Sequence, residues 1–409
     1  MNNRNRWIGV VAACTVFVIA GALLAQDSPQ WRGPNRDGKV SGFAAPQKWP
    51  TALAQKWKVT VGAGNATPAL VGDRLYVFTR QDANEVILCM NAGDGKEIWR
   101  NAYPAPAISG PDAAVHSGPR SSPAVADGKI CTLGVTGIVS CVDAASGKPL
   151  WHKDDFPGVW PRFHTSSSPI IVDGMCIVQL GGPGNGGIVA YALANGDVKW
   201  KWTGDGAAYA SPVWMTVEGT KQIVALTDKL VVGVAVADGK LLWDVPFPTT
   251  GMAYNAATPI VDGQTVIVTG QGRGTKALKI EKQGDAFKAS DVWSNPDLAP
   301  QFNTPILKEG FLYGLSGKGN LFCINAKTGQ TAWTDTTGRG GFGAMVDAGS
   351  CLMLLPQKSQ LIVFQPSGTA YAELASITVS DKQTYAQPIV AGKRIFVRDQ
   401  DSVTSFTID

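Results

Sequence analysis

The sequence contains few histidines and little excess charge. His116, His152 and His164 are its only histidines, and none stands at a spacing from a cysteine or another histidine that is typical of a zinc site. The formal net charge is +4, and it falls further if the segment with Arg4 and Arg6 is removed. So small a net charge is too weak to indicate binding to nucleic acids or to anionic membranes, and we expect no nucleic-acid partner. With 17% charged and 44% hydrophobic residues, the composition also excludes a disordered chain.

A long uncharged run lies at the N-terminus. Arg4 and Arg6 precede it, it extends over residues 7–25, and the polar sequence QDSPQ follows. This order is typical of a secretory signal peptide, so we expect cleavage after Ala25 and a periplasmic or secreted protein. If it is retained, the run is long enough to anchor the chain in a membrane. The sequence VAAC ending at Cys14 resembles a lipoprotein cleavage box, which makes lipidation a third alternative.

Two short motifs recur along the rest of the chain. One ends in an aromatic residue, as in DAASGKPLW, which ends at Trp151. The other begins with Ser or Thr before Pro and passes through a DG turn into an alternating strand, as in SSPAVADGKICTL from Ser121. Pro favours extended backbone, and Asp and Gly favour tight turns, so each unit contains four short antiparallel strands. Five intervals separate Trp99 from Trp333, which gives a repeat of about 47 residues.

Four-stranded units at this repeat length are typical of propeller blades. No blade can bury both of its faces alone, so we expect the recurring aromatic residues to fill the gaps between blades. These residues are Trp57, Trp99, Trp151, Trp200, Trp243, Trp293 and Trp333, with Tyr371 in the remaining position. The last repeat, from Ala386, lacks a closing aromatic strand, and Trp57 lacks the strands that should precede it. Joining the two ends completes an eighth blade and removes an exposed sheet edge.

The sequence therefore predicts an all-β, eight-bladed β-propeller over residues 53–409, preceded by a lead-in over residues 26–52 and a signal peptide or anchor over residues 1–25. The two motifs resemble the repeat of the pyrroloquinoline-quinone (PQQ)-like eight-bladed propellers, and PQWRGPNRDG (Pro29–Gly38) resembles the lead-in of secreted bacterial members. That family contains quinoprotein dehydrogenases and also non-catalytic envelope scaffolds, such as the propeller subunit of the outer-membrane barrel assembly machinery.

Two functions follow from this resemblance. A quinoprotein dehydrogenase would hold PQQ and a calcium ion over the central channel, with an Asp as general base and a disulfide between adjacent cysteines. The sequence has neither an adjacent Cys-Cys pair nor a Cys-x-x-Cys-His haem motif. We therefore favour a monomeric binding or scaffold module without catalytic residues, whose partner is an envelope protein, a peptide or a small anionic ligand. A PQQ- and calcium-dependent oxidoreductase is the alternative.

The cysteines occupy two repeat positions. One position contains Cys89, Cys141 and Cys323, and the other contains Cys131, Cys176 and Cys351. Residues of this kind act as small apolar strand residues, and we expect equivalent positions in different blades to lie far apart. Cys131 and Cys141 lie in neighbouring strands of one blade, and this pair is the one candidate for a disulfide.

Candidate binding residues lie in the loops that lead into the Ser-Pro and Thr-Pro strands. Ring symmetry brings these loops together at one mouth of the channel. Arginines there would pair with a carboxylate and aromatic rings would stack on a ligand, although the same side chains would also serve to cap strand ends. The candidates are Arg120, Arg162, His164, Tyr209, Tyr254, Asn255, Asn303 and Arg339.

Overall fold

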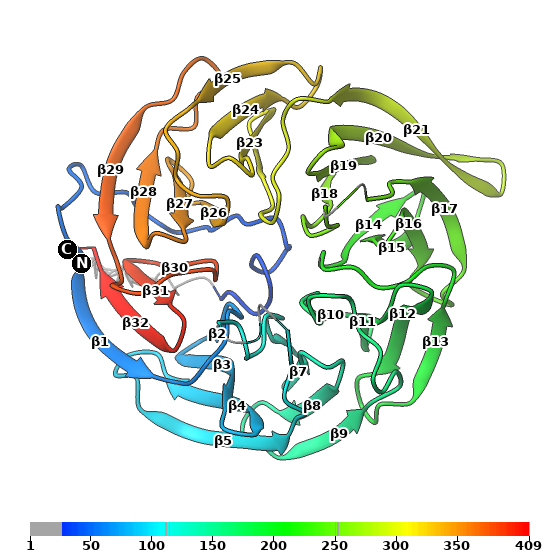
Figure 1. Ribbon diagram of the computed structural model, residues 1–409, viewed down its shortest axis with the longest axis horizontal. Helices are drawn as coiled ribbons and strands as arrows, with labels where there is room; N and C mark the ends of the chain where they lie inside the picture. The colour runs from blue at the N-terminus through cyan, green and yellow to red at the C-terminus, as the bar shows by residue number, and fades with distance from the viewer. Residues whose placement is uncertain (1–26, 111–112, 114, 250, 252, 409) are drawn as a thin grey trace, which may run out of the picture.

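Every regular element in the described part of the computed structural model is a β-strand, and the strands form eight four-stranded antiparallel sheets arranged in a ring (Figure 1). The structure describes residues 27–408 except 111, 112, 114, 250 and 252. Within these residues, no helix has the length and hydrophobicity that crossing a membrane requires. The predicted signal segment, residues 1–25, lies outside the described residues. The prediction of an eight-bladed propeller is confirmed.

The first four blades each run from an inner strand at the channel to an outer strand at the perimeter. Blade 1 contains β2 (Ala69–Val71), β3 (Arg74–Gln81), β4 (Asn84–Asn91) and β5 (Glu97–Pro104). Blade 2 contains β6 (Ala124–Ala126), β7 (Lys129–Leu133), β8 (Val139–Asp143) and β9 (Pro149–Lys153). Blade 3 contains β10 (Ile170–Val172), β11 (Met175–Gly182), β12 (Asn185–Ala192) and β13 (Val198–Trp202). Blade 4 contains β14 (Val213–Val217), β15 (Thr220–Leu226), β16 (Leu230–Ala235) and β17 (Leu241–Pro246).

The remaining blades follow the same order, except that the last one takes its outer strand from the N-terminal side. Blade 5 contains β18 (Ile260–Asp262), β19 (Thr265–Gly270), β20 (Gly274–Gln283) and β21 (Ala286–Asn295). Blade 6 contains β22 (Ile306–Lys308), β23 (Phe311–Leu315), β24 (Leu321–Asn325) and β25 (Thr331–Asp335). Blade 7 contains β26 (Gly343–Asp347), β27 (Leu352–Pro356), β28 (Gln360–Phe364) and β29 (Glu373–Thr378). Blade 8 contains β30 (Ile389–Ala391), β31 (Arg394–Arg398), β32 (Ser402–Thr407) and β1 (Ala54–Thr60).

Blade 8 closes the ring by joining the two ends of the chain. Trp57 of β1 is opposite Ser405 of β32, so the predicted pairing of the ends is confirmed. Arg398 strengthens the junction with blade 1: it is 1% exposed and donates to the carbonyl oxygens of Gly64 (3.0 Å) and Phe78 (2.7 Å). Residues more than 300 positions apart are therefore held together by a buried guanidinium.

The DG turns are tight hairpins between the first two strands of a blade. In blade 2, Asp127 and Gly128 both have positive φ angles, 50° and 69°. Two successive positive φ angles define a type I′ turn, which matches the twist of a hairpin and favours Asp-Gly. The repeated DG pairs thus shape the blades.

Eight apolar clusters fill the spaces between neighbouring blades in the described part of the chain. The recurring tryptophans belong to these clusters. The indole of Trp151, for example, donates from Nε1 to the carbonyl oxygen of Leu193 in the next blade (3.1 Å). Gly196 in the same turn packs on the ring, since a Cβ there would come within 2.8 Å of it. The Trp of one motif thus packs on the Gly-containing turn of the same motif in the next blade.

The same contact recurs at the other tryptophans except Trp243 and Trp99. Blade 7 lacks it, and the prediction that Tyr371 takes the closing position there is wrong: Ala375 is opposite Val363 at the place of the tryptophan, and Tyr371 packs between blades 6 and 7. Indole Nε1 groups donate to a carbonyl oxygen of the next blade at Trp57, Trp200, Trp293 and Trp333. Trp243 instead donates to Gln222 Oε1 of its own blade (2.7 Å), because blade 5 replaces the short turn with the long hairpin of β20 and β21. The Nε1 of Trp99 has no hydrogen-bond partner, and the equivalent carbonyl, that of Ala144, accepts from Arg74 (3.1 Å) and Tyr76 (3.2 Å).

The Ser and Thr residues before proline link the inner strands of neighbouring blades. The Ser122 N–H donates to Ser168 Oγ, and the Ser168 N–H donates to Ser211 Oγ, each at 2.9 Å. Equivalent bonds join Thr258 to Thr304 and Gln387 to Thr67. The hydroxyl groups therefore satisfy backbone donors that short inner strands leave unpaired.

The expectation that cysteines at equivalent positions of different blades lie far apart is wrong for two of them. Cys131 and Cys176 occupy equivalent positions in blades 2 and 3, yet both lie with Cys141 in a single inter-blade cluster. Equivalent positions in adjacent blades meet because neighbouring sheets pack face to face. Burial, and then contact with the Cys141 and Cys176 thiols, raises the pKa of the Cys131 thiol. Cys131 is directly opposite Cys141, and all three are free thiols in the structure.

A buried carboxyl group connects blades 1 and 2. Glu85 is fully buried; it accepts hydrogen bonds from the Tyr103 hydroxyl and from the Val135 N–H, both at 2.8 Å. Burial raises the pKa of Glu85, while these two bonds act in the opposite direction.

Candidate functional site

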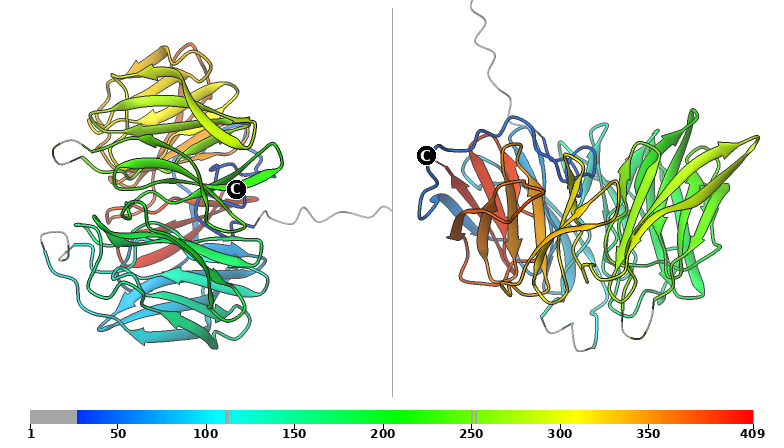
Figure 2. Two further views of the ribbon diagram at one scale, coloured as in Figure 1. Left: turned by 90° about the vertical axis from the view of Figure 1, so that its right-hand side faces the viewer. Right: turned by 90° about the horizontal axis from the view of Figure 1, so that it is seen from above.

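The lead-in segment closes one end of the central channel. The right-hand view of Figure 2 shows it along one face of the ring. Arg32 donates to the carbonyl oxygens of Thr304 (3.2 Å) and Pro305 (2.9 Å) in blade 6. Arg36 donates to those of Ser168 (3.1 Å) and Pro169 (2.8 Å) in blade 3. The lead-in is therefore bound to both sides of the ring.

Burial explains the properties of these two arginines. It lowers the pKa of Arg32 to about 10 and that of Arg36 to about 9. The positive charge of Arg32 also contributes to the lower pKa of Arg36. Both groups remain charged at neutral pH, so their hydrogen bonds to backbone carbonyls are charge-assisted and strong. The indole Nε1 of Trp31 adds a bond to Thr258 Oγ1 in blade 5 (3.1 Å).

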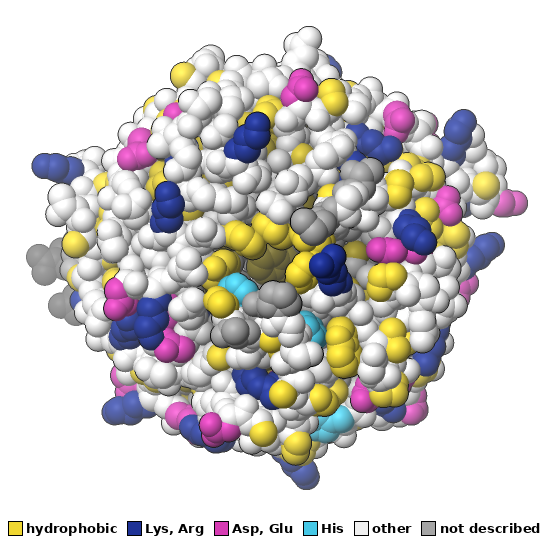
Figure 3. All heavy atoms as spheres, viewed as in Figure 1, with side chains coloured by type: hydrophobic (Ala, Val, Ile, Leu, Met, Phe, Trp, Pro, Cys, Tyr) yellow, Lys and Arg dark blue, Asp and Glu magenta, His cyan; other side chains and the backbone are white. Residues whose placement is uncertain are grey.

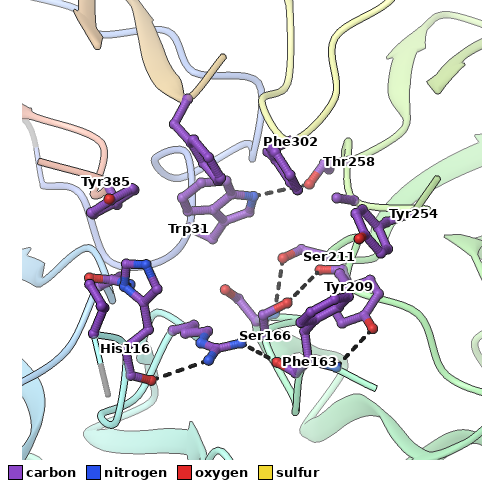
Figure 4. Close-up of a pocket in the computed structure, with 16 residues that line it drawn as sticks. Trp31, His116, Phe163, Ser166, Tyr209, Ser211, Tyr254, Thr258, Phe302 and Tyr385 are labelled. Atoms are coloured by element: carbon purple, nitrogen blue, oxygen red, sulfur yellow. Dashed lines mark hydrogen bonds between the residues drawn. The ribbon is translucent and has the colours of Figure 1, made fainter. Parts of the chain in front are cut away.

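A cavity of about 550 Å³ lies in the channel above Trp31. Figure 3 shows a hollow with hydrophobic side chains around it at the centre of the face opposite the lead-in. Six aromatic rings from successive inter-blade loops form most of its wall, and we call the cavity with this wall and with Trp31 as its floor the aromatic cup (Figure 4). The six wall residues are Phe163, Tyr209, Tyr254, Phe302, Phe342 and Tyr385.

The rings of the aromatic cup touch one another in sequence around the channel. The Phe163 and Tyr254 rings meet edge to face with centroids 5.0 Å apart, and Tyr209 meets Tyr254 in the same way at 5.9 Å. Tyr254 stacks on Phe302 at 5.9 Å, and Phe302 stacks on Phe342 at 4.1 Å. The chain of contacts continues as Phe342 meets Tyr385 at 5.4 Å and Tyr385 meets His116 at 4.8 Å.

Polar side chains complete the lining: Asn65, His116 and Arg120 at blades 1 and 2, and Ser166, Ser168, Ser211 and Thr258 at blades 3 to 5. The Asn65 amide and His116 Nδ1 lie 2.9 Å apart. The Arg120 guanidinium donates to the carbonyl oxygens of Phe163 and His116, which fixes it against two loops. The Phe163 N–H donates to the Tyr209 hydroxyl (3.1 Å). The cup thus combines a ring of aromatic side chains with polar groups from blades 1 to 5.

Three of the eight candidate binding residues from the sequence line this cavity: Arg120, Tyr209 and Tyr254. The other five do not line it.

Three of those five anchor the loops that carry the rings. Asn255 follows Tyr254, is buried, and donates from Nδ2 to the Thr227 carbonyl oxygen (2.8 Å). Asn303 follows Phe302 and donates from Nδ2 to the carbonyl oxygen of Leu315 (2.8 Å). Each amide holds the neighbouring aromatic residue in place.

His164 has the same relation to Phe163. It is buried, and its ring stacks on Trp160 with centroids 5.8 Å apart. Its φ angle of 63° is uncommon for a residue other than glycine, and it turns the chain immediately after Phe163.

The last two candidates are arginines outside the cavity. Arg162 is exposed, and its guanidinium lies 5.3 Å from the Phe163 ring centroid. Arg339 is 6% exposed, pairs with Asp335 (2.5 Å) and lies over the Tyr371 ring at 4.9 Å, so it links blades 6 and 7.

The sequence interpretation missed several residues of the cup. Phe163, Phe302, Phe342 and Tyr385 were not among the candidates, and neither were His116 and Trp31. A signal was available for some of them, because an aromatic residue precedes the Ser-Pro, Thr-Pro or Gln-Pro pair at Tyr209, Phe302 and Tyr385 by the same two positions.

The donors of the cup do not fit a quinone with calcium. Calcium takes six to eight oxygen ligands, usually including carboxylates. The described residues that line the cavity include neither Asp nor Glu, and no cluster of His, Cys, Asp and Glu suited to a metal occurs among the described residues. Aromatic rings, hydroxyl groups and one guanidinium favour an organic ligand instead.

Comparison with known proteins relates this ring to a family. The family model described as outer membrane protein assembly factor BamB matches residues 36–201 and 84–335. The BamB of Yersinia pestis is 25% identical over 246 residues, which cover 57% of this chain and 60% of that relative; the chain therefore spans about three fifths of the relative's length.

Two solved structures show the same fold. BamB from Moraxella catarrhalis superposes with a TM-score of 0.65 at 12% identity, over 87% of this chain and 98% of that one. The quinohemoprotein alcohol dehydrogenase from Comamonas testosteroni superposes with a TM-score of 0.68 at 14% identity, over 93% and 80% of the two chains. Since the family model matches well over half of the sequence, the chain belongs to the BamB family of PQQ-like eight-bladed propellers.

Proposed function

We propose that this chain is a non-catalytic binding propeller of the cell envelope that takes part in the assembly of outer-membrane proteins. The family match carries the proposal, because it covers most of the blades. The Yersinia pestis relative is an outer membrane protein assembly factor. Neighbouring solved structures include an alcohol dehydrogenase, but the lining of the aromatic cup does not supply the carboxylates that a calcium-quinone centre requires.

The aromatic cup offers this function a place of contact. It is a concave, mainly aromatic site of about 550 Å³, within the range of protein ligand sites, and several polar groups line it beside the rings. The hydrogen bonds of Asn255 and Asn303 hold its loops, so the shape of the site is set before a partner binds.

The proposal includes export by the N-terminal segment, residues 1–25, and a monomeric propeller in the periplasm or tethered to a membrane. The sequence order of positive, uncharged and polar residues supports export.

The test is deletion of the gene in its host, followed by measurement of folded outer-membrane protein. Folded barrels migrate differently from unfolded ones on gels run without heating, so the folded fraction can be quantified. We expect deletion to lower this fraction and the parent gene to restore it. An unchanged folded fraction after deletion would contradict the proposed function.

A further inference from the structure

We propose that the aromatic cup binds a single aromatic side chain presented by an extended segment of a partner polypeptide. The inference deepens the proposed function and rests on it.

The first argument is the aromatic surface that the fold leaves uncovered. None of the six wall rings is fully buried, and Trp31 at the floor is also only half-buried. Each of these rings keeps a part of its surface exposed to the cavity, and apolar surface gathered in a hollow marks a binding site. Covering it with a ligand is favourable at roughly 25 cal/mol per Å² of apolar surface removed from water.

The second argument is the orientation of the rings, which favours an aromatic guest over an aliphatic one. Phe163 and Tyr209 each meet Tyr254 at 89°, and Phe342 meets Tyr385 at 85°. Perpendicular neighbours present both faces and edges around the cavity. A further ring in this space gains about 0.5–1.5 kcal/mol per favourable aromatic contact beyond the area it buries.

The third argument is that the cup has one open end. Trp31 closes the floor, and the buried bonds of Arg32 and Arg36 hold the segment that carries it. A chain cannot thread through the channel, so one group enters from the mouth while the rest of the ligand stays outside. Val115, which lines the cavity and is 53% exposed, and the exposed Arg162 beside Phe163 supply contact surface for that remainder.

An outer-membrane protein that has not yet folded, which we call a client, offers the kind of group that such a site would bind. Folded proteins bury most of their aromatic side chains, whereas chains that have not yet folded expose them. A site for one aromatic side chain therefore recognises non-native polypeptides with little dependence on their sequence.

The experiment is a calorimetric titration of the purified protein with two pentapeptide amides, acetyl-Gly-Ser-Trp-Ser-Gly and its counterpart with Leu in place of Trp. We expect the Trp peptide to bind about three- to tenfold more tightly, the equivalent of the aromatic contact energy above. Ala256 lines the cup, so the Ala256→Trp variant places an indole in it that competes with the guest ring for the aromatic wall, and it should weaken binding at least tenfold. Tyr254→Ser is the second variant if Ala256→Trp does not fold.

The matched control is Trp214→Ala. Trp214 is also a partly exposed aromatic residue, 44% exposed on β14, but it does not line the cavity. Its variant should bind like the parent. Equal affinity for the two peptides, or parental affinity in a folded cup variant, would overturn the inference. Equally tight binding of free N-acetyltryptophanamide would overturn its polypeptide part and assign the cup to small aromatic molecules.

The inference and the proposed function fail separately. If deletion lowers the folded fraction of outer-membrane protein and the Ala256→Trp gene restores it fully, the cup does not receive clients and the proposed function stands. If the peptides bind as expected while deletion changes nothing, the cup binds aromatic side chains and the proposed function falls.

Discussion

The contact between a tryptophan and the turn of the next blade gives a quantitative prediction, because the same repeat position can be compared in two blades. Trp151→Phe removes the indole N–H that donates to Leu193, whose carbonyl oxygen then keeps only a weak contact from the Cys141 thiol (3.9 Å). Leaving a buried acceptor unsatisfied costs about 1–3 kcal/mol. Loss of ring area adds to this cost.

Trp99→Phe is the matched control, because it deletes the same atoms where the hydrogen bond is absent. The Trp99 Nε1 has no partner, and the Ala144 carbonyl oxygen is satisfied by Arg74 and Tyr76. Removing an unpaired buried donor recovers part of its desolvation cost. We therefore expect Trp151→Phe to be more destabilising than Trp99→Phe by about 2 kcal/mol.

The assay is the thermal midpoint of unfolding by calorimetry. The unfolding entropy is about 2.1 cal/mol/K per residue, so for a chain of this length a 2 kcal/mol difference lowers Tm by about 2–3 °C. Equal midpoints for the two variants, or a lower one for Trp99→Phe, would refute the assignment of the indole hydrogen bond as the feature that distinguishes these contacts.

Three further predictions concern buried groups. Burial raises the pKa of Glu85, so the folded state binds the carboxyl proton more tightly than the unfolded state, and stability is lost as pH rises through the raised pKa. Glu85→Gln should remove this loss of stability, which is measured as Tm against pH. A difference in Tm between parent and variant that is the same at every pH would contradict the prediction. Arg398→Met should lower stability by about 3–5 kcal/mol, because it leaves several carbonyl oxygens at the ring junction unpaired; an unchanged Tm would show that the junction does not depend on them. Cys131, Cys141 and Cys176 should resist maleimide until the protein is unfolded, since all three thiols are buried and burial also raises the pKa of Cys131; labelling of any of the three in the folded protein, or a mass showing a disulfide, would be contrary to this.

The sequence was sufficient to predict the eight blades and their closure. The repeat fixes the number of blades, and the pairing of the strand around Trp57 with the C-terminal strands, which the structure confirms, follows from the incomplete motifs at the two ends. The lead-in was predicted only as a separate segment, because it has no repeat and its contacts are single arginine side chains reaching blades 3 and 6.

The cup was predicted in place but only partly in composition. The loops vary in length: Tyr209 precedes Ser211 by two residues, whereas Tyr254 precedes Thr258 by four. Which of two neighbours points into the channel depends on local backbone angles, such as the positive φ of His164. Polar residues next to the rings were therefore selected as ligand contacts, although they anchor the loops.

The most direct test of a binding propeller against a quinoprotein is a titration of the purified protein with PQQ in the presence of calcium, with an alcohol and a redox dye in the cell. Because the described lining residues include no carboxylate, we expect no stoichiometric binding of quinone and no alcohol-dependent reduction of the dye. One tightly bound quinone per chain, together with dye reduction that requires the alcohol, would contradict the account.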